Sequence, residues 1–308
     1  MTMQSDPRRD NAGRGILLAL AAILVFSTQD ATSKFLVQSD VSPYQMTMMR
    51  FWAFAAFSLL LAWQQGGLRD ALRSKHKVLQ LARGGLLVSD IWMYVLALST
   101  VPLAAVQSIT LVYPLLVTLF AIPLLGERVG VFRIVAVIVG FLGALVIVRP
   151  GGVPLDLGVL YAVGSGSAYA LYIVLTRKVS ADDSPTTSMV YTGIVGLMIS
   201  TGVGVFHWGA LDLNSLLLIG YIMLTGVVAH GMMILALSMA PASVLQPFNY
   251  TSLPWSILLS IVIFHEPIDA ISLLGAAIIV GAGLVVMARE RIKKVPPASA
   301  EPALPGKE

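Results

Sequence analysis

Long apolar runs dominate this sequence and recur along nearly its whole length. A helix needs about 20 apolar residues to cross a bilayer, and most of these runs reach that length. Only 12% of the 308 residues are charged and 57% are hydrophobic, whereas an ordinary soluble domain carries about 25% charged residues. Because this is too much apolar surface for one water-soluble core, we expect an all-α integral membrane protein.

Ten transmembrane helices are predicted. Their approximate spans are 14–37, 43–64, 82–99, 102–125, 130–148, 157–176, 187–207, 213–237, 241–264 and 269–288. Residues 1–13 are predicted to be an N-terminal tail, and the Pro-rich, polar residues 289–308 a disordered C-terminal tail. Lysine and arginine gather in the connections that ten spans place on one side, so we expect a plasma (inner) membrane protein with both termini in the cytoplasm.

Two segments that lie 139 residues apart are similar in sequence. Residues 97–128 read ALSTVPLAAVQSITLVYPLLVTLFAIPLLGER, and residues 236–267 read ALSMAPASVLQPFNYTSLPWSILLSIVIFHEP. The match extends to the first span of each half, where Gly15 to Lys34 aligns with Gly158 to Arg177. The chain therefore contains an internal duplication.

The duplication predicts two five-helix halves, residues 14–149 and 157–288. Because five is an odd number, the second half enters the membrane from the opposite side, which makes the repeat inverted. Known inverted repeats are mostly transporters with a substrate site between the halves. The alternative is a duplicated bundle without a transport role. Since one chain supplies both halves, a monomer suffices.

Three features of the sequence indicate a family resemblance. They are the repeated ALS–Pro–Gln–Glu segments, the LLGER end of the fourth span, and the basic residue that closes the first span of each half. Over about residues 14–290 the chain resembles the ten-helix EamA-type branch of the drug/metabolite transporter superfamily. The resemblance implies transport of small organic solutes, not catalysis, and no cofactor. Many relatives have a Trp-Gly pair where this chain has Asp30 and Lys34. In this respect it looks like the branch assigned to metabolites such as S-adenosylmethionine or amino acids.

Charged residues inside the spans are candidate functional groups, because a charge within the bilayer is costly. Asp30 and Lys34 lie four positions apart on one face of the first span, and Arg50 lies about two turns into the second. We expect an Asp30–Arg50 or Asp30–Lys34 pair, which would either fasten helices or act in gating or substrate binding. Lys34 could alternatively extend to the membrane interface.

Asp90 and His230 are candidates for the substrate site or for proton transfer. No cation in the third span can pair with Asp90, so the acid needs a partner on another helix or faces a wet cavity. The repeat places His230 near the level of Asp90 in the other half. A membrane histidine is often a packing residue, but it can also relay protons near neutral pH. A proton is therefore a candidate coupling ion.

Polar and aromatic residues of the fourth and ninth spans complete the predicted site: Gln107, Tyr113, Gln246, Asn249 and Tyr250. Side-chain amides both donate and accept hydrogen bonds and so suit a zwitterion, although they can also join helices. We expect Pro114, Pro247 and Pro254 to interrupt their helices. Trp92, Tyr94 and Tyr169 are candidates for an aromatic wall, with interfacial or packing roles as the alternative.

The leading function is a secondary transporter that moves small organic metabolites by alternating access. Efflux of amino acids or related amphiphiles is the first substrate hypothesis, and an importer or exchanger such as an S-adenosylmethionine carrier is the second. A membrane-embedded enzyme or a structural subunit is the alternative of another class, but no catalytic constellation is visible. The chain has no cysteine, and its basic residues flank spans, so neither a thiolate metal site nor nucleic-acid binding is expected. Glu127 and Glu266 are interpreted as helix-capping or loop-fastening residues, with gating as the alternative.

Overall fold

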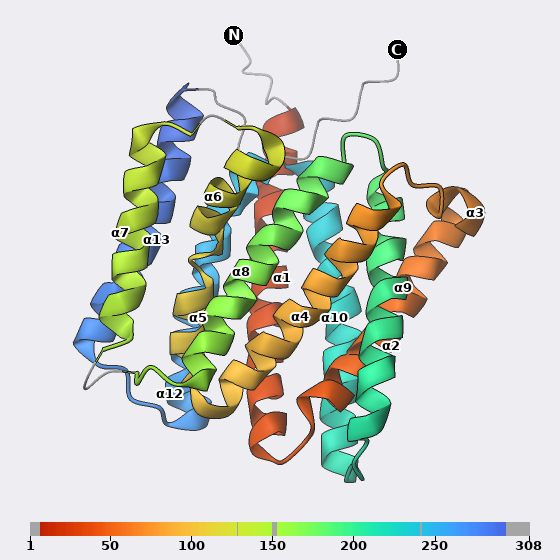
Figure 1. The fold of residues 1–308 in the computed structure, drawn as a ribbon, viewed down its shortest axis with the longest axis horizontal. Helices are drawn as coiled ribbons and strands as arrows, with labels where there is room; N and C mark the ends of the chain where they lie inside the picture. The colour runs from red at the N-terminus through yellow and green to blue at the C-terminus, as the bar shows by residue number, and fades with distance from the viewer. Residues whose placement is uncertain (1–6, 128, 150–152, 241, 294–308) are drawn as a thin grey trace.

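A computed structural model describes residues 7–127, 129–149, 153–240 and 242–293, and within these ranges the chain forms helices and turns without a β-strand. The long helices run between two faces of the molecule (Figure 1). α1 begins and α13 ends at one of these faces, which we call the terminal face. We call the other one the opposite face. This is the predicted all-α, membrane-spanning fold.

Seven helices make up the first half. They are α1 (Pro7–Gln38), α2 (Pro43–Gln64), the short α3 (Leu68–Ala71), α4 (Lys77–Thr100), α5 (Leu103–Thr110), α6 (Tyr113–Leu125) and α7 (Val131–Ile147). The second half comprises α8 (Leu157–Val179), α9 (Pro185–Gly204), the 3₁₀ turn η1 (Val205–His207), α10 (Leu213–Met239), α11 (Ala242–Leu245), the 3₁₀ segment η2 (Gln246–Thr251), α12 (Ser252–Phe264) and α13 (Ala270–Lys293).

The ten predicted spans are present. Within the described residues, nine helical segments are long and apolar enough to cross a membrane, and the tenth span, α7, is a shorter apolar helix. α1 begins at Pro7 and α13 continues to Lys293, so both end helices extend into the segments predicted to be tails. The remaining tail residues, 1–6 and 294–308, lie outside the described part of the chain.

Prolines set several helix boundaries, because a proline ring is compatible with the first helical turn but not with the interior. The Ser-Pro pairs at 42–43 and 184–185 begin α2 and α9. Ser184 caps α9 by accepting a hydrogen bond from the Thr187 amide at 3.0 Å. The fourth and ninth spans are broken as predicted: Pro114 lies at the start of α6 and Pro247 at the start of η2. Pro254 instead lies in the first turn of α12.

The helix packing follows the inverted repeat. α4 of the first half packs along α8 of the second, and α10 of the second half packs along α1 of the first. α2 packs along its counterpart α9, and α7 along its counterpart α13. α7 and α13 stand together at one edge of the molecule, as the left side of Figure 1 shows. α2 and α9 stand towards the other edge in this view, and the remaining long helices lie between these two pairs, where the two halves meet.

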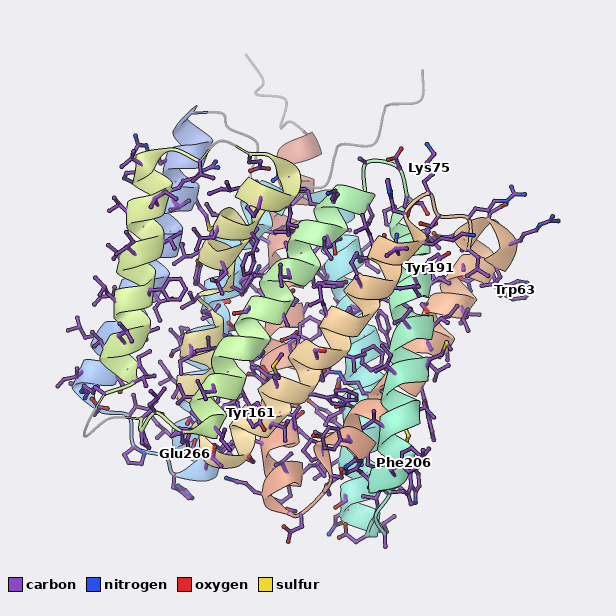
Figure 2. The ribbon with its side chains drawn as sticks, viewed as in Figure 1. Trp63, Lys75, Tyr161, Tyr191, Phe206 and Glu266 are labelled. Carbon is purple, nitrogen blue, oxygen red and sulfur yellow. The ribbon has the colours of Figure 1, made fainter. Side chains whose placement is uncertain are left out.

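Apolar side chains cover the outside of the bundle, as expected for a surface that faces lipid (Figure 2). Large exposed side chains include Leu142, Leu224 and Leu258 at mid-helix positions. Trp63 is 74% exposed towards the terminal face and Phe206 is 84% exposed towards the opposite face. Aromatic side chains at both ends of the helices are typical of membrane–water interfaces.

Replacing Gly143 by alanine is expected to lower the stability of the protein by about 1–3 kcal/mol, the range for overpacking. α7 and α13 touch at backbone level here, and a Cβ at Gly143 would lie 2.9 Å from the carbonyl oxygen of Gly275. The check is the unfolding temperature in detergent. The matched control is Gly281→Ala in α13, where a Cβ meets nothing within 4 Å. Equal unfolding temperatures for the two variants would contradict the close contact.

Candidate functional site

A cavity of about 320 Å³ lies at the centre of the bundle, between the two halves. Its volume falls within the range of small-molecule sites, roughly 300–1,000 Å³. Helices α1, α2, α4, α5 and α6 of the first half line it together with α8 and α10 of the second. The polar lining residues are Asp30, Ser33, Arg50, Asp90, Tyr94, Gln107, Thr110, Tyr113, Ser165, Tyr169 and His230. The cavity is therefore shared by the halves, where an inverted-repeat transporter places its substrate.

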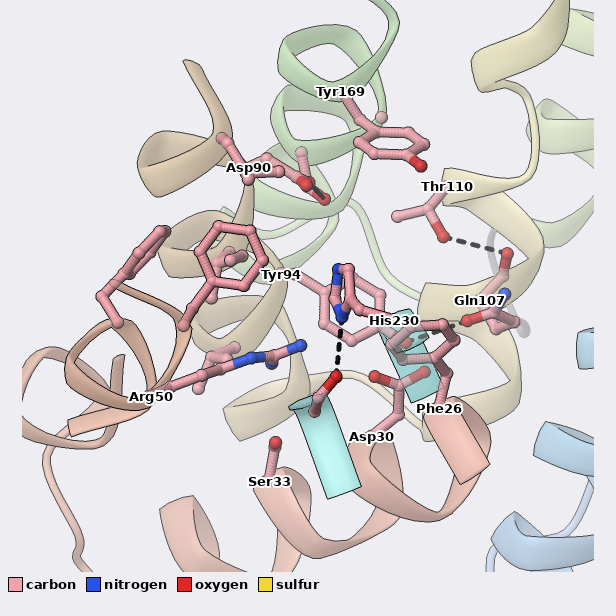
Figure 3. A pocket seen from close by; sticks show the side chains of 18 of the residues that line it. Phe26, Asp30, Ser33, Arg50, Asp90, Tyr94, Gln107, Thr110, Tyr169 and His230 are labelled. Carbon is pink, nitrogen blue, oxygen red and sulfur yellow. Dashed lines mark hydrogen bonds between the residues drawn. The ribbon is translucent and has the colours of Figure 1, made fainter. Parts of the chain in front are cut away.

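Two acids and one guanidinium give the cavity its charge. Asp30 projects from α1, Arg50 from α2 and Asp90 from α4 (Figure 3). Arg50 interacts electrostatically with both acids, although no ion-pair distance below 4 Å joins it to either within the described residues. The Asp90 carboxyl accepts a hydrogen bond from the Ser165 hydroxyl of α8 at 2.6 Å. This contact is the partner on another helix that Asp90 needs.

His230 contributes an aromatic and polar group from α10. Its ring lies against two phenylalanines, with centroid distances of 5.1 Å to Phe26 and 5.3 Å to Phe54. Its Nδ1 lies 2.8 Å from the carbonyl oxygen of Gly226, one turn earlier. If Nδ1 carries the proton and donates a hydrogen bond to this carbonyl, Nε2 of the neutral ring is an acceptor.

Three tyrosines and the Gln107 amide form one wall of the cavity. The Tyr94 hydroxyl donates to the Gln107 amide oxygen at 2.9 Å, and Gln107 in turn donates to Ser252 of α12 at 2.9 Å. The rings of Tyr113 and Tyr169 meet edge to face at 4.9 Å. This wall offers flat aromatic surface together with hydrogen-bonding groups, which suits a heteroaromatic ring.

Four predicted residues do not line the cavity. Trp92 packs edge-on against Tyr44 at 5.4 Å, Tyr250 is buried in the core, and Asn249 lies behind the wall, where it donates to the Tyr113 hydroxyl at 3.4 Å. Lys34 does not pair with Asp30. It is buried and forms an ion pair with Glu266 at 2.5 Å, so it does not reach the interface either. The side chain of Gln246 lies outside the described part of the structure.

Several lining residues were not predicted, among them Phe26, Phe54, Thr110 and Ser165. The repeat contains a signal for Phe26, because the alignment of residues 15–34 with 158–177 pairs Phe26 with Tyr169. Ser165 lies in the small-residue run VGSGSAYA, where close helix contact is the usual interpretation. Contact does occur there, since a Cβ at Gly166 would lie 3.3 Å from the Thr110 carbonyl oxygen. The cavity lies beside this contact.

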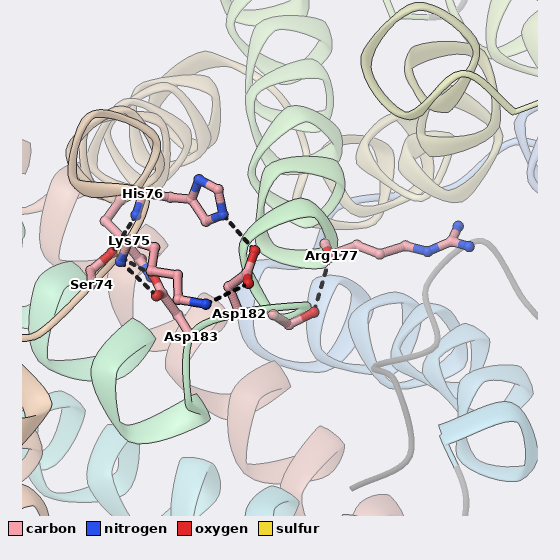
Figure 4. A network of polar contacts seen from close by, with 8 residues as sticks. Ser74, Lys75, His76, Arg177, Asp182 and Asp183 are labelled. Atoms are coloured by element: carbon pink, nitrogen blue, oxygen red, sulfur yellow. Dashed lines mark hydrogen bonds and ion pairs between the residues drawn. The ribbon is translucent and has the colours of Figure 1, made fainter. Parts of the chain in front are cut away.

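At the terminal face, a polar network joins residues just before and at the start of α4 to the α8–α9 connection (Figure 4). Asp182 accepts from His76 at 2.8 Å and from Lys75 at 3.1 Å, and these contacts lower the pKa of its carboxyl. Asp183 accepts from Ser74, Gln80 and the Lys75 amide. Burial alone would raise the pKa of Asp183, but these hydrogen bonds outweigh it and the pKa is lowered.

Apolar side chains pack together near the opposite face. Leu36 and Val41 pack against Ile219 and Ile222, and all four are buried. A polar network thus lies at the terminal face and an apolar cluster near the opposite face. Within the described residues, no group of three His, Asp or Glu side chains could hold a metal ion.

A central cavity between inverted five-helix halves defines the class: a membrane transporter of small molecules built from an internal repeat. The family model for the EamA-like transporter family matches residues 13–149 and 156–288, so each half matches separately. The chain belongs to the EamA-like transporter family. It is a transporter of small metabolites and not an enzyme.

Relatives with named functions are similar over most of their length. A riboflavin transporter of Vibrio cholerae is 29% identical over 270 residues, which cover 87% of this chain and 90% of the relative. An S-adenosylmethionine uptake transporter of Rickettsia prowazekii is 24% identical over 277 residues, 90% of this chain and 93% of the relative. A solved crystal structure shares the fold, with a TM-score of 0.63, 21% identity and coverage of 91% of this chain and 98% of that chain.

Proposed function

We propose that this protein carries a zwitterionic metabolite with a second cationic centre and a flat heteroaromatic ring, of which S-adenosylmethionine is the model. This proposal rests on the charged side chains that line the cavity. Two acids, Asp30 and Asp90, surround one guanidinium, Arg50. S-adenosylmethionine has the complementary set, with an ammonium, a sulfonium and one carboxylate. Its adenine would lie against the aromatic wall that includes Tyr113 and Tyr169.

The other substrates under consideration match this charge set less well. Riboflavin, the substrate named for the Vibrio cholerae relative, is neutral and would leave both acids and the guanidinium without partners. A simple amino acid has one ammonium and one carboxylate, so one acid would stay unmatched. Unpaired charges in a low-dielectric site are costly. Amino acid efflux therefore remains the second candidate, favoured for amino acids with a cationic side chain.

The proposed mechanism is alternating access, in which one half rocks against the other and opens the cavity to one face at a time. The terminal face is proposed to be cytoplasmic in a plasma membrane, because the basic residues gather in its connections. His230, with its ring in the cavity, is the proposed site for a coupling proton. Counterflow that does not respond to an imposed pH gradient would remove this part of the proposal.

Counterflow in liposomes tests the substrate. Purified protein is reconstituted in vesicles loaded with unlabelled S-adenosylmethionine, and we expect transient accumulation of the labelled compound. S-adenosylhomocysteine should compete at least about tenfold less well, since it lacks the sulfonium charge and about 1.4 kcal/mol of lost attraction already means a factor of ten. Riboflavin, methionine and lysine are tested in parallel. Exchange of riboflavin without exchange of S-adenosylmethionine would overturn the proposal.

A further inference from the structure

Two ion pairs connect the halves at opposite ends of the molecule. Lys34 of α1 pairs with Glu266, which follows α12, near the opposite face. Arg177 of α8 pairs with Glu127, which follows α6, near the terminal face. In each pair the basic residue comes from the first helix of one half, and the acid follows the fourth span of the other half.

The two pairs are equivalent under the inverted repeat. Lys34 aligns with Arg177, and Glu127 aligns with Glu266. The surrounding backbone is equivalent too. The Glu127 amide donates to the Ala121 carbonyl at 3.3 Å, and the Glu266 amide donates to the Ser260 carbonyl at 3.1 Å. The same arrangement of base, acid and backbone therefore occurs near both faces.

The pair at the opposite face is the more deeply buried one. The Lys34 side chain is 2% exposed and also donates to the Val101 carbonyl at 2.9 Å. Glu266 accepts from the Leu103 amide at 3.1 Å and from the Ser260 hydroxyl at 2.6 Å. These contacts hold three segments together: the end of α1, the α4–α5 turn and the end of α12.

Each basic residue lies on a helix that lines the cavity. Asp30, a cavity residue, is one turn before Lys34 on α1. Tyr169, also a cavity residue, is two turns before Arg177 on α8. Separation of either pair would therefore free the end of a helix whose middle forms the wall of the cavity. That is the movement needed to open the cavity towards the face on which the pair lies.

We propose that the two ion pairs are alternating latches of the transport cycle. The Lys34–Glu266 latch opens when the cavity opens to the opposite face, and the Arg177–Glu127 latch opens when it opens to the terminal face. The inference rests on the alternating access proposed above but not on the identity of the substrate. It also gives Glu127 and Glu266 a gating role in addition to fastening their loops.

Cysteine accessibility tests the latches without any substrate, because the chain has no cysteine of its own. A single Val227→Cys substitution places a thiol on the cavity wall, and a membrane-impermeant maleimide is applied from either side of oriented vesicles. A separate Lys75→Cys protein identifies the side of the terminal face, where the Lys75 side chain is 73% exposed.

Lys34→Gln should increase labelling from the opposite face and decrease it from the terminal face, and Arg177→Gln should do the reverse. Each change is expected to be about tenfold, within the range common for coupling between two sites. The charge-swapped double variant Lys34→Glu/Glu266→Lys should return labelling towards the Val227→Cys reference. Glu266→Gln and Glu127→Gln repeat the test if a lysine or arginine variant fails to fold.

The matched control is Arg149→Gln. It breaks another ion pair between the halves, Arg149–Asp269 at 2.6 Å, which joins the ends of the peripheral helices α7 and α13. It should leave labelling from both sides unchanged. Equal increases from both sides in the Lys34 and Arg177 variants, or no change in either, would show that the pairs are static fasteners and overturn the latches. If the Lys34 and Arg177 variants shift labelling in opposite directions but S-adenosylmethionine counterflow fails, only the proposed substrate is overturned.

Discussion

Asp90→Asn is expected to reduce transport of S-adenosylmethionine at least about tenfold while leaving the fold intact. At an effective dielectric constant of about 20, two unit charges 4 Å apart attract by roughly 4 kcal/mol, so loss of one carboxylate removes more than a factor of ten in binding. Asparagine has the same shape, and its amide oxygen can still accept the hydrogen bond that Ser165 donates at 2.6 Å. The initial rate of counterflow and the unfolding temperature are measured together.

Asp70→Asn is the control for this substitution. Asp70 forms an ion pair with Arg73 in a connection, and both side chains are about two-thirds exposed (67% and 70%). An exposed pair contributes little to stability, so this variant should transport like the unchanged protein. If Asp90→Asn transports at the normal rate, Asp90 is a hydrogen-bonded packing residue and the charge complementarity proposed for the cavity is wrong.

The fold was predictable from the sequence because two strong and independent patterns agree. The length of the apolar runs specifies helices that span the membrane, because every backbone polar group in lipid must be paired within the helix. The repeat around residues 97–128 and 236–267 specifies how the halves are related. The least predictable parts were the helix ends. α1 begins within the predicted tail, at Pro7, because nothing in the hydropathy pattern prevents a helix from continuing into water.

The candidate site was predictable only in part, because position along a helix gives depth but not direction. Asp90, Tyr94 and His230 have the right depth and also face the cavity. Trp92 has nearly the same depth, but it lies two residues from Asp90 on the same helix and therefore points elsewhere, towards Tyr44. Apolar lining residues such as Phe54 have no sequence signal, because a membrane helix is apolar on every side.

The Lys34 pairing shows a second limit of the sequence. Spacing of four residues on α1 made a local pair with Asp30 one of the two expected pairs, whereas the observed partner of Lys34, Glu266, lies in the other half of the chain. The repeat contained the required signal, because Lys34 aligns with Arg177 and Glu127 aligns with Glu266. Only the packing of α1 against the second half shows which acid each base can reach.

Arg50→Gln is expected to change the selectivity of the transporter as well as its rate. Of the described residues that line the cavity, Arg50 alone carries a fixed positive charge. In the proposed binding mode it pairs with the carboxylate of the substrate, and an arginine–carboxylate pair is strong because two parallel hydrogen bonds can form. Decarboxylated S-adenosylmethionine lacks that group. The unchanged protein should therefore prefer S-adenosylmethionine, and the variant should prefer the decarboxylated compound. The ratio of the apparent affinities for the two compounds should differ about a hundredfold between the two proteins.

Arg50→Gln alone leaves Asp30 and Asp90 without a cation, and breaking charge compensation in a buried site can unfold a protein. The double variant Arg50→Gln/Asp30→Asn therefore accompanies it, because it removes one charge of each sign and keeps the net charge of the cavity. Both proteins are tested by competition counterflow with the two compounds. An unaltered preference for S-adenosylmethionine in a folded double variant would show that Arg50 does not bind the carboxylate. Loss of transport of both compounds in that folded variant, but not in the single Asp30→Asn protein, would instead assign Arg50 to positioning Asp90, with which it already interacts electrostatically.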